Sequence, residues 1–143
     1  MSRSIFLNGK VRKRSIPALP LPLPPNAPEL RRLMLPQGEL AQFHDSDEAI
    51  RYIAFIELLA GQVRGNHYHK VKREFVYVVR GEVMLHSVDI ESGARISLTL
   101  QAGDLATIET GIAHALQTLQ PGQAIEFSPA RFDAADIYRH SVA

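Results

Sequence analysis

Three histidines and one glutamate stand out in the sequence as residues able to bind a metal ion. His67 and His69 are separated by a single residue, and Glu74 follows five positions after the second histidine. His114 lies in a second glycine-framed stretch, Gly103–Thr118. Three imidazoles and one carboxylate form a ligand set suited to a divalent transition metal. The question is whether the fold brings these four side chains to one point.

Strand geometry explains how these residues can act together. Side chains alternate between the two faces of a strand, so His67 and His69 project to the same side. The polar segment Lys70–Arg73 can reverse the chain, and Glu74 then begins an adjacent antiparallel strand. His114 completes the set if a barrel brings its strand alongside. The set suits Zn, Fe, Mn, Ni, Co or Cu without choosing among them, and open coordination positions leave room for water or substrate.

Length and composition indicate one small domain. The chain has 143 residues, of which 45% are apolar, enough for a single core. With 16 basic and 15 acidic residues the net charge is close to neutral, which argues against a nucleic-acid-binding protein. Cysteine is absent, so disulfides and thiolate-bound zinc are excluded. We find no apolar run that spans a membrane and no secretory signal, and therefore expect a cytoplasmic protein without membrane contact.

The first 37 residues differ in character from the rest. A basic run before position 15 is expected to be a solvated arm, with a contact to an anionic ligand or nucleic acid as the alternative. Ser15–Pro28 holds six of the nine prolines, so its backbone must be extended and cannot be a central strand. Its leucines favour a strap over the domain or over a second subunit, with an SH3-type ligand as the alternative. Ala27–Leu35 is expected to form one helical turn.

From Gly38 onward the sequence has the character of β-structure. Short segments of strand-forming residues alternate with turn residues, which is typical of an all-β sandwich or barrel. We therefore divide the chain into an N-terminal arm, residues 1–37, and a β-barrel domain, residues 38–143. Asp133–His140 is expected to be a last helical turn or an irregular tail. The predicted strands are 40–44, 50–59, 66–69, 74–79, 82–89, 94–100, 104–108, 114–119 and 124–128.

The glycines and the ligands together resemble the two motifs of the cupin superfamily. The first motif, G-x5-H-x-H-x3–4-E-x6-G, is matched by Gly61, His67, His69, Glu74 and Gly81. The second motif, G-x5-P-x-G-x2-H-x3-N, is matched by Gly103, Gly111 and His114, with Glu109 and Thr118 at the proline and asparagine positions. The resemblance covers about residues 38–128. It implies a single-domain, RmlC-like jelly-roll β-barrel that is usually a homodimer, with the metal inside.

A narrower resemblance concerns the run GQVRGNHYHK. It looks like the RG-x-H-x-H segment of nucleotide-sugar 3,4-ketoisomerases and of the cupin domains of polysaccharide-biosynthesis epimerases or reductases. In the ketoisomerases the paired histidines act as general acid and base on a 4-keto sugar, usually without metal, which implies catalytic roles for His67 and His69. Those enzymes commonly have glutamine at the position of Glu74. Glu74 and His114 therefore favour the metal-binding, epimerase-like domains as the closer comparison.

Three further residues are candidates for substrate contacts. Arg64 precedes the histidine pair and can meet a phosphate or carboxylate at the barrel mouth, with a plain surface arginine as an equal alternative. His86 can share a barrel face with Met84 and Val88, although a structural histidine is the more common case. Gln117 is expected near the entrance.

Three classes of function remain open from the sequence. The first is a metal-dependent enzyme on a small oxygenated substrate, such as a sugar or nucleotide-sugar isomerase or epimerase. The second is an Fe-dependent dioxygenase with the same ligand set. The third is a non-catalytic cupin that binds a metal or small ligand. Because one scaffold of this kind hosts many chemistries, the fold alone does not choose among them.

Overall fold

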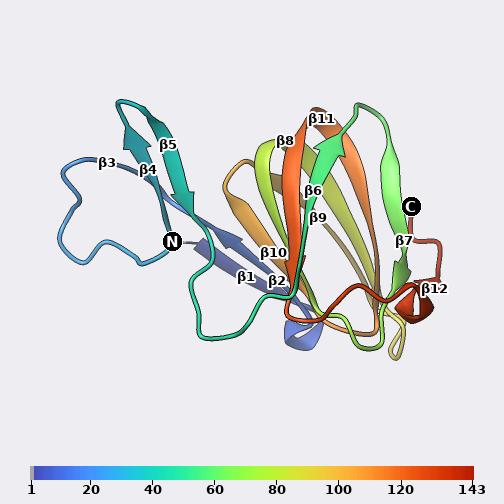
Figure 1. The fold of residues 1–143 in the computed structure, drawn as a ribbon. Helices are drawn as coiled ribbons and strands as arrows, with labels where there is room; N and C mark the ends of the chain where they lie inside the picture. The colour runs from blue at the N-terminus through green and yellow to red at the C-terminus, as the bar shows by residue number, and fades with distance from the viewer. Residues whose placement is uncertain (1) are drawn as a thin grey trace.

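Almost all of the regular structure in the protein is β-strand. The computed structural model describes residues 2–143, and Figure 1 shows a barrel of strands with a smaller sheet projecting from one side. No helix in these residues is long and apolar enough to cross a membrane. The elements are β1 (Ser2–Phe6), η1 (Leu7–Gly9), β2 (Val11–Ser15), β3 (Ala18–Pro20), β4 (Arg31–Leu35), β5 (Gly38–Gln42), β6 (Tyr52–Leu58), β7 (Val63–Tyr68), β8 (Glu74–Asp89), β9 (Arg95–Gln101), β10 (Asp104–Ile108), β11 (Ile112–Ser128), η2 (Ala134–Asp136) and β12 (Tyr138–Arg139).

Nine strands form one antiparallel sheet that curls into the barrel. Their order is β1-β2-β10-β8-β11-β7-β12, with β6 beside β11 and β9 beside β8. The two longest strands, β8 and β11, pair along most of their length, with Leu85 opposite Leu116 near the middle. Opposed residues on paired strands point to the same face, so these two strands line the interior together. The expectation of a single all-β barrel is confirmed.

Two apolar clusters lie on opposite faces of this sheet. Side chains inside the barrel include Ile56, Val78, Leu85, Leu100 and Ile108. The outer cluster is formed by Ile16, Leu30, Phe75, Tyr77, Leu105 and Phe127. Neighbouring residues at the start of β8 therefore face in opposite directions, with one in the barrel interior and the next under the N-terminal segment.

The N-terminal residues are part of the barrel sheet. β2 pairs with β10 along its whole length, and the side chain of Val11 is completely buried in the interior cluster. Arg12 forms an ion pair with Glu109 at 2.7 Å. The expectation of a solvated arm before position 15 is therefore wrong, because residues 11–15 pair with β10 and Val11 packs in the interior cluster.

The proline-rich segment leaves the barrel and returns through a small sheet. β3 runs parallel to β4, and β4 pairs with β5 in antiparallel fashion, forming the projection seen in Figure 1. The helical turn expected over Ala27–Leu35 is wrong, because residues 31–35 extend to pair with both neighbours. Arg32 of β4 is fixed to Glu39 of β5 at 2.7 Å. The division into an arm and a domain at residue 38 stays a prediction.

The strands predicted separately at 74–79 and 82–89 form one long strand with a bend at Gly81. Gly81 has φ +92, and a Cβ there would approach the carbonyl oxygen of Gln120 to 2.6 Å. The pairing register with β11 shifts at this point. Before the bend the inward residues are Glu74, Val76 and Val78, and after it they are Val83 and Leu85. The bend thus reverses which alternate residues face the interior.

Candidate metal centre

Four side chains from three strands and the loop after β7 meet inside the barrel. His67 is the second-last residue of β7, and His69 follows the end of that strand. Glu74 is the first residue of β8, and His114 lies on β11. His114 is paired directly with His67 across the β7–β11 ladder, which brings the second glycine-framed stretch to the first. Each residue offers one ligand atom, and these four atoms all lie within 4.8 Å of one another.

Gly65 allows β7 to approach β11 closely at this site. Its φ is +99, and a Cβ at this position would lie 2.7 Å from the carbonyl oxygen of His114. The register between the strands shifts between His114 and Ala115. Only glycine suits both the backbone angle and the space.

Two of the imidazoles are fixed by backbone carbonyls. Nδ1 of His69 lies 2.7 Å from the carbonyl oxygen of Asp136, and Nδ1 of His114 lies 3.0 Å from that of Ile112. A carbonyl oxygen only accepts hydrogen bonds, so Nδ1 carries the hydrogen in both rings. In each neutral ring the lone pair is then on Nε2.

Both Nε2 atoms point at the carboxylate of Glu74. Nε2 of His69 is 2.8 Å from Oε1, and Nε2 of His114 is 3.0 Å from Oε2. Despite the short distance, Nε2 of His69 is buried without an aligned hydrogen bond. Imidazole lone pairs facing carboxylate lone pairs repel unless a cation, either a proton or a metal ion, lies between them. The donor set therefore fits a divalent transition metal.

Charges at the site follow from this arrangement in the metal-free chain. Burial favours the neutral acid, but His114, His69 and Lys72 together hold the pKa of Glu74 well below its ordinary value. For His114, burial lowers the pKa, yet the Glu74 carboxylate outweighs it and the pKa is raised. Burial and the other two histidines lower the pKa of His67 to about 4. His67 is therefore neutral near pH 7, the form that binds metal.

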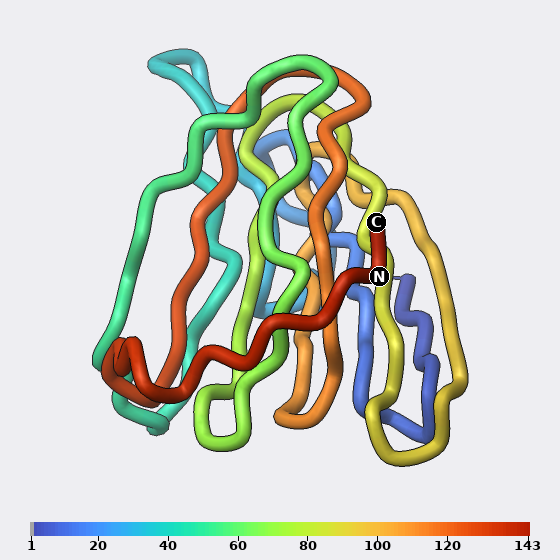
Figure 2. The backbone as a smooth tube through the Cα atoms, turned by 90° about the vertical axis from the view of Figure 1, so that its right-hand side faces the viewer, coloured from blue at the N-terminus to red at the C-terminus, as the bar shows by residue number. Residues whose placement is uncertain are grey.

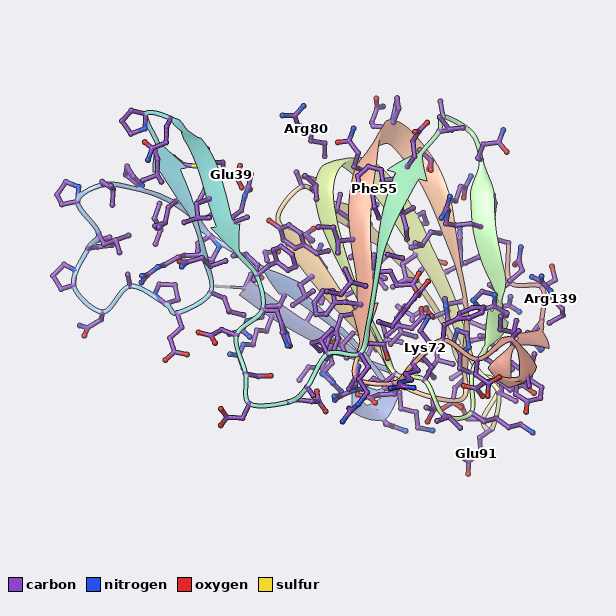
Figure 3. All side chains as sticks on the ribbon, in the orientation of Figure 1. Glu39, Phe55, Lys72, Arg80, Glu91 and Arg139 are labelled. Atoms are coloured by element: carbon purple, nitrogen blue, oxygen red, sulfur yellow. The ribbon has the colours of Figure 1, made fainter. Side chains whose placement is uncertain are left out.

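A buried lysine and a second carboxylate adjoin the ligands, and the sequence did not indicate either. Nζ of Lys72 lies 2.6 Å from Oε1 of Glu126 and 3.2 Å from Oε1 of Glu74. It also sits 4.3 Å from the centroid of the Tyr52 ring, near the lower end of the barrel in Figure 3. Burial and the charge of Glu74 raise the pKa of Glu126. The feature of the sequence that could have indicated Glu126 is its position as an acidic residue in an otherwise apolar strand segment.

A cavity of about 170 Å³ leads to the ligands. Of the residues expected to contact substrate, Arg64 lines this cavity and lies exposed on β7. The other lining residues are Ile56, Gly65, His67, Glu74, Val76, His114, Leu116 and Glu126.

His86 and Gln117 are not among the cavity residues. Nε2 of His86 lies 2.9 Å from Oε1 of Gln117, and Nδ1 lies 2.8 Å from Oγ of Ser97. These side chains form a network on the outer face of the sheet, because the bend at Gly81 turns even-numbered residues of β8 outward. The structure thus brings neither residue to the ligands.

Comparisons with known proteins agree with this geometry. Residues 54–128 match the family described as the cupin domain, Cupin_2. No curated protein sequence matches the chain at a significant level.

Several solved structures share the fold at low sequence identity. The RmlC epimerase of Mycobacterium tuberculosis is 15% identical with a TM-score of 0.74, covering 97% of this chain and 72% of its own. A 3,4-ketoisomerase from Helicobacter canadensis is 15% identical with a TM-score of 0.67, covering 77% and 86%. The dTDP-6-deoxy-D-glucose-3,5-epimerase RmlC of Legionella pneumophila, in complex with dTDP-4-keto-L-rhamnose, is 15% identical with a TM-score of 0.72, covering 96% and 76%.

Proposed function

Because the chain belongs to the cupin domain family, we propose that its barrel binds one divalent transition metal and acts on a small oxygenated substrate. The substrate class is a sugar or nucleotide-sugar, and the reaction is an isomerisation or epimerisation. One observation carries the proposal: Nε2 of His69 and Nε2 of His114 both face the carboxylate of Glu74 at the base of a cavity. Such a cluster requires a cation, and the cavity gives a substrate access to it.

The proposal gives roles to the four candidate ligands and to two further polar residues of the cavity. His67, His69, Glu74 and His114 would hold the metal, which when bound supplies a Lewis acid that polarises a carbonyl oxygen. Arg64 is placed to bind a phosphate or carboxylate of the substrate at the cavity wall.

Glu126 is the cavity carboxylate that remains outside the ligand set. Lys72 holds it in place through the contact at 2.6 Å. As a carboxylate beside the candidate ligands, it would accept a proton from a substrate hydroxyl or from the carbon beside the carbonyl.

The solved structures support the sugar substrate class. Those named above are two RmlC epimerases and a 3,4-ketoisomerase, and one of them holds dTDP-4-keto-L-rhamnose. At 15% identity the likeness establishes the fold alone, and the substrate class enters only as part of this proposal.

The direct test combines metal analysis with a proton-exchange assay. The full chain, purified without added metal, is expected to contain close to one divalent ion per chain. Incubation with dTDP-4-keto-6-deoxyglucose in D2O should then incorporate deuterium beside the carbonyl, as followed by NMR. Glu74→Gln should lose both the ion and the exchange. His86→Asn is the matched control, because His86 lies on the outer face, and it should retain both.

The other outcomes assign other functions. A folded chain without bound metal would contradict the proposed metal binding. Deuterium incorporation catalysed by that metal-free chain would assign acid–base catalysis to His67 and His69. A bound metal without exchange, but with oxygen uptake by the Fe(II)-loaded chain, would indicate the dioxygenase. If the chain shows neither deuterium exchange nor oxygen uptake, the remaining function is that of a non-catalytic cupin that binds a metal or small ligand.

We also propose that two copies of the chain associate. Large apolar side chains are exposed on β6, where Ile53 is 70% and Phe55 69% exposed, and on the projecting sheet at Met34 and Leu40. Clustered exposure of this kind is characteristic of an interface. The cytoplasmic location stays a prediction.

A further inference from the structure

The segment after the barrel strands lies along the strand that carries the first two ligands. η2 is followed by β12, which pairs with β7 so that Arg139 is opposite His67 and Tyr138 opposite Tyr68. Figure 2 shows this segment crossing the outside of the barrel. The rings of Tyr138 and Tyr68 stack with centroids 5.2 Å apart. The segment is thus packed on the metal centre from outside.

Asp136 in η2 contacts the centre through both its backbone and its side chain. Its carbonyl oxygen lies 2.7 Å from Nδ1 of His69. Its carboxylate accepts three consecutive backbone N–H groups: Lys70 to Oδ1 at 2.8 Å, Lys72 to Oδ2 at 3.0 Å, and Val71 to both oxygens at 3.2 Å. Consecutive N–H groups converging on one anion form a nest, an arrangement that holds a loop in a single conformation.

The loop held in this way joins two of the ligands. Lys70–Arg73 is the covalent connection between His69 and Glu74. Its conformation sets the separation of those two side chains and also carries Lys72, whose Nζ lies 3.2 Å from Oε1 of Glu74. Through this loop, the carboxylate of Asp136 influences the positions of His69, Lys72 and Glu74.

Asp136 is buried, with 7% of its surface exposed. Burial favours the neutral acid, but the N–H groups of Lys70, Lys72 and Val71 outweigh it, and the pKa of Asp136 is lowered. The three backbone N–H groups thus compensate the carboxylate for its burial by direct hydrogen bonds.

We propose that Asp136 is a positioning residue of the metal centre: its carbonyl orients His69, and its carboxylate sets the loop between His69 and Glu74. The role toward a metal rests on the proposed function, whereas the effect on His69 and the loop exists in the metal-free chain. Asp136 itself touches neither metal nor substrate. It acts on them by aiming Nε2 of His69 at Glu74.

The test compares Asp136→Asn with Asp133→Asn. The asparagine at 136 keeps the size of the side chain but replaces one accepting oxygen by an NH2 group that opposes the loop N–H groups. Asp133 is the matched control because it lies exposed in the same segment and its carboxylate accepts from the N–H of Ala135, at 2.9 Å, and not from the loop that joins His69 to Glu74. Circular dichroism and thermal unfolding establish that both variants are folded.

Metal affinity is the first measurement, made by competition between the full chain and a chromophoric chelator for Co(II) and Zn(II). Asp136→Asn should weaken binding by about 10–100-fold, the usual effect of losing a group that orients a ligand, while the control stays within about twofold of wild type. Equal affinity in all three chains would overturn the proposal.

The second measurement uses the metal-free chain and does not depend on the metal. Long-range ¹H–¹⁵N NMR should show the hydrogen of His69 on Nδ1, and the amides of Val71 and Lys72 should exchange slowly in wild type and rapidly in Asp136→Asn. A hydrogen on Nε2, or fast exchange in wild type, would overturn the proposal even if the variant fails to fold. A wild-type chain with this NMR signature but no metal affinity would contradict the proposed function and leave the positioning role supported.

Discussion

At the scale of single residues, Lys72 determines how much negative charge the barrel interior can hold. Two carboxylates, Glu74 and Glu126, lie beside it, and 6% of its own surface is exposed. Removing one member of a buried ionic cluster leaves its partners without compensation, which costs more than the cluster contributes when complete. The lysine is thus a structural requirement of the site as well as a neighbour of the ligands.

Lys72→Met should lower the free energy of unfolding by about 3 kcal/mol, because methionine keeps the apolar stem but removes the charge. Urea unfolding of the metal-free chain near neutral pH measures the effect. Adding Glu126→Gln should restore part of the loss. Lys70→Met is the control: its Nζ lies over the Tyr138 ring at 4.4 Å, and its loss should cost about 0.5 kcal/mol. Equal losses in both single variants would contradict the interpretation.

At the scale of elements, the closeness of β7 and β11 sets the separation of His67 and His114. Gly65 permits this closeness, since a Cβ there would lie 2.7 Å from a backbone oxygen of β11. Backbone atoms cannot move aside as a flexible side chain can. Displacement of β7 would therefore carry His67 away from the other ligands.

Gly65→Ala should destabilise the chain by about 3 kcal/mol and weaken metal binding, because it combines backbone strain with a steric clash. Gly61→Ala provides the matched control. Gly61 also has positive φ, +74, but no atom lies within 4 Å of its would-be Cβ. That variant should cost about 1–2 kcal/mol and leave metal affinity unchanged. Thermal unfolding measures the backbone strain in both variants, and the chelator competition measures the displacement of β7 through the loss of metal affinity. Equal metal affinity in both variants would contradict the prediction.

The end of β8 is tied to the N-terminal hairpin by an ion pair that responds to acid. Asp89 accepts from Nζ of Lys10 at 2.9 Å, and this contact, assisted by the N–H of Glu91, lowers the pKa of Asp89. Its ionised form thus stabilises the fold above the unfolded-state pKa of about 3.9, and the contribution disappears as pH falls through the lower folded-state pKa.

Asp89→Asn should therefore reduce stability near neutral pH and show a smaller further loss on acidification below about pH 4 than wild type. Urea unfolding across this range makes the comparison. Glu91→Gln is the control, because Glu91 is 88% exposed and 3.6 Å from Lys10, and its acid response should match wild type. Parallel acid curves for wild type and Asp89→Asn would contradict the assignment.

The convergence of the four candidate ligand side chains was predictable, because each motif keeps its residues within a short stretch of chain. Gly61, Gly103 and Gly111 lie at turns, and strand alternation brings His67 and His69 to one side. The expected pairing of the Glu74 strand with the histidine strand is wrong, because β11 lies between β7 and β8. His86 was less predictable, since the bend at Gly81 reverses the alternation midway along β8. Asp136 carried no local signal. Its partners lie more than 60 residues earlier in the chain, and only the folded structure shows the contact.

At the scale of the whole molecule, the outer face of β6 is the clearest candidate for contact between copies. Ile53 and Phe55 alternate with the inward residues of that strand and remain uncovered in the single chain. A second surface, on the projecting sheet, exposes Leu40 and Met34. Two separate apolar surfaces on one small molecule favour a symmetric pair in which each is covered.

Phe55→Asp should therefore convert a dimer into a monomer, because it places a charge at the centre of the apolar surface. Light scattering coupled to gel filtration measures the mass in solution. Glu57→Gln is the control, since Glu57 is exposed on the same strand and its change adds no charge to the surface. A monomeric wild type, or a Phe55→Asp variant that remains dimeric, would contradict the assignment of this face.

The candidate ligand side chains are held in place by the protein itself. The carbonyl oxygens of Asp136 and Ile112 fix two imidazoles, and Lys72 lies against Glu74. A rigid set of nitrogen and oxygen donors follows the general order of affinity among divalent metals and discriminates weakly beyond it. If the site binds a metal as proposed, the identity of that metal would reflect the supply of free ions in the cell, and recombinant protein would differ from the native protein wherever that supply differs.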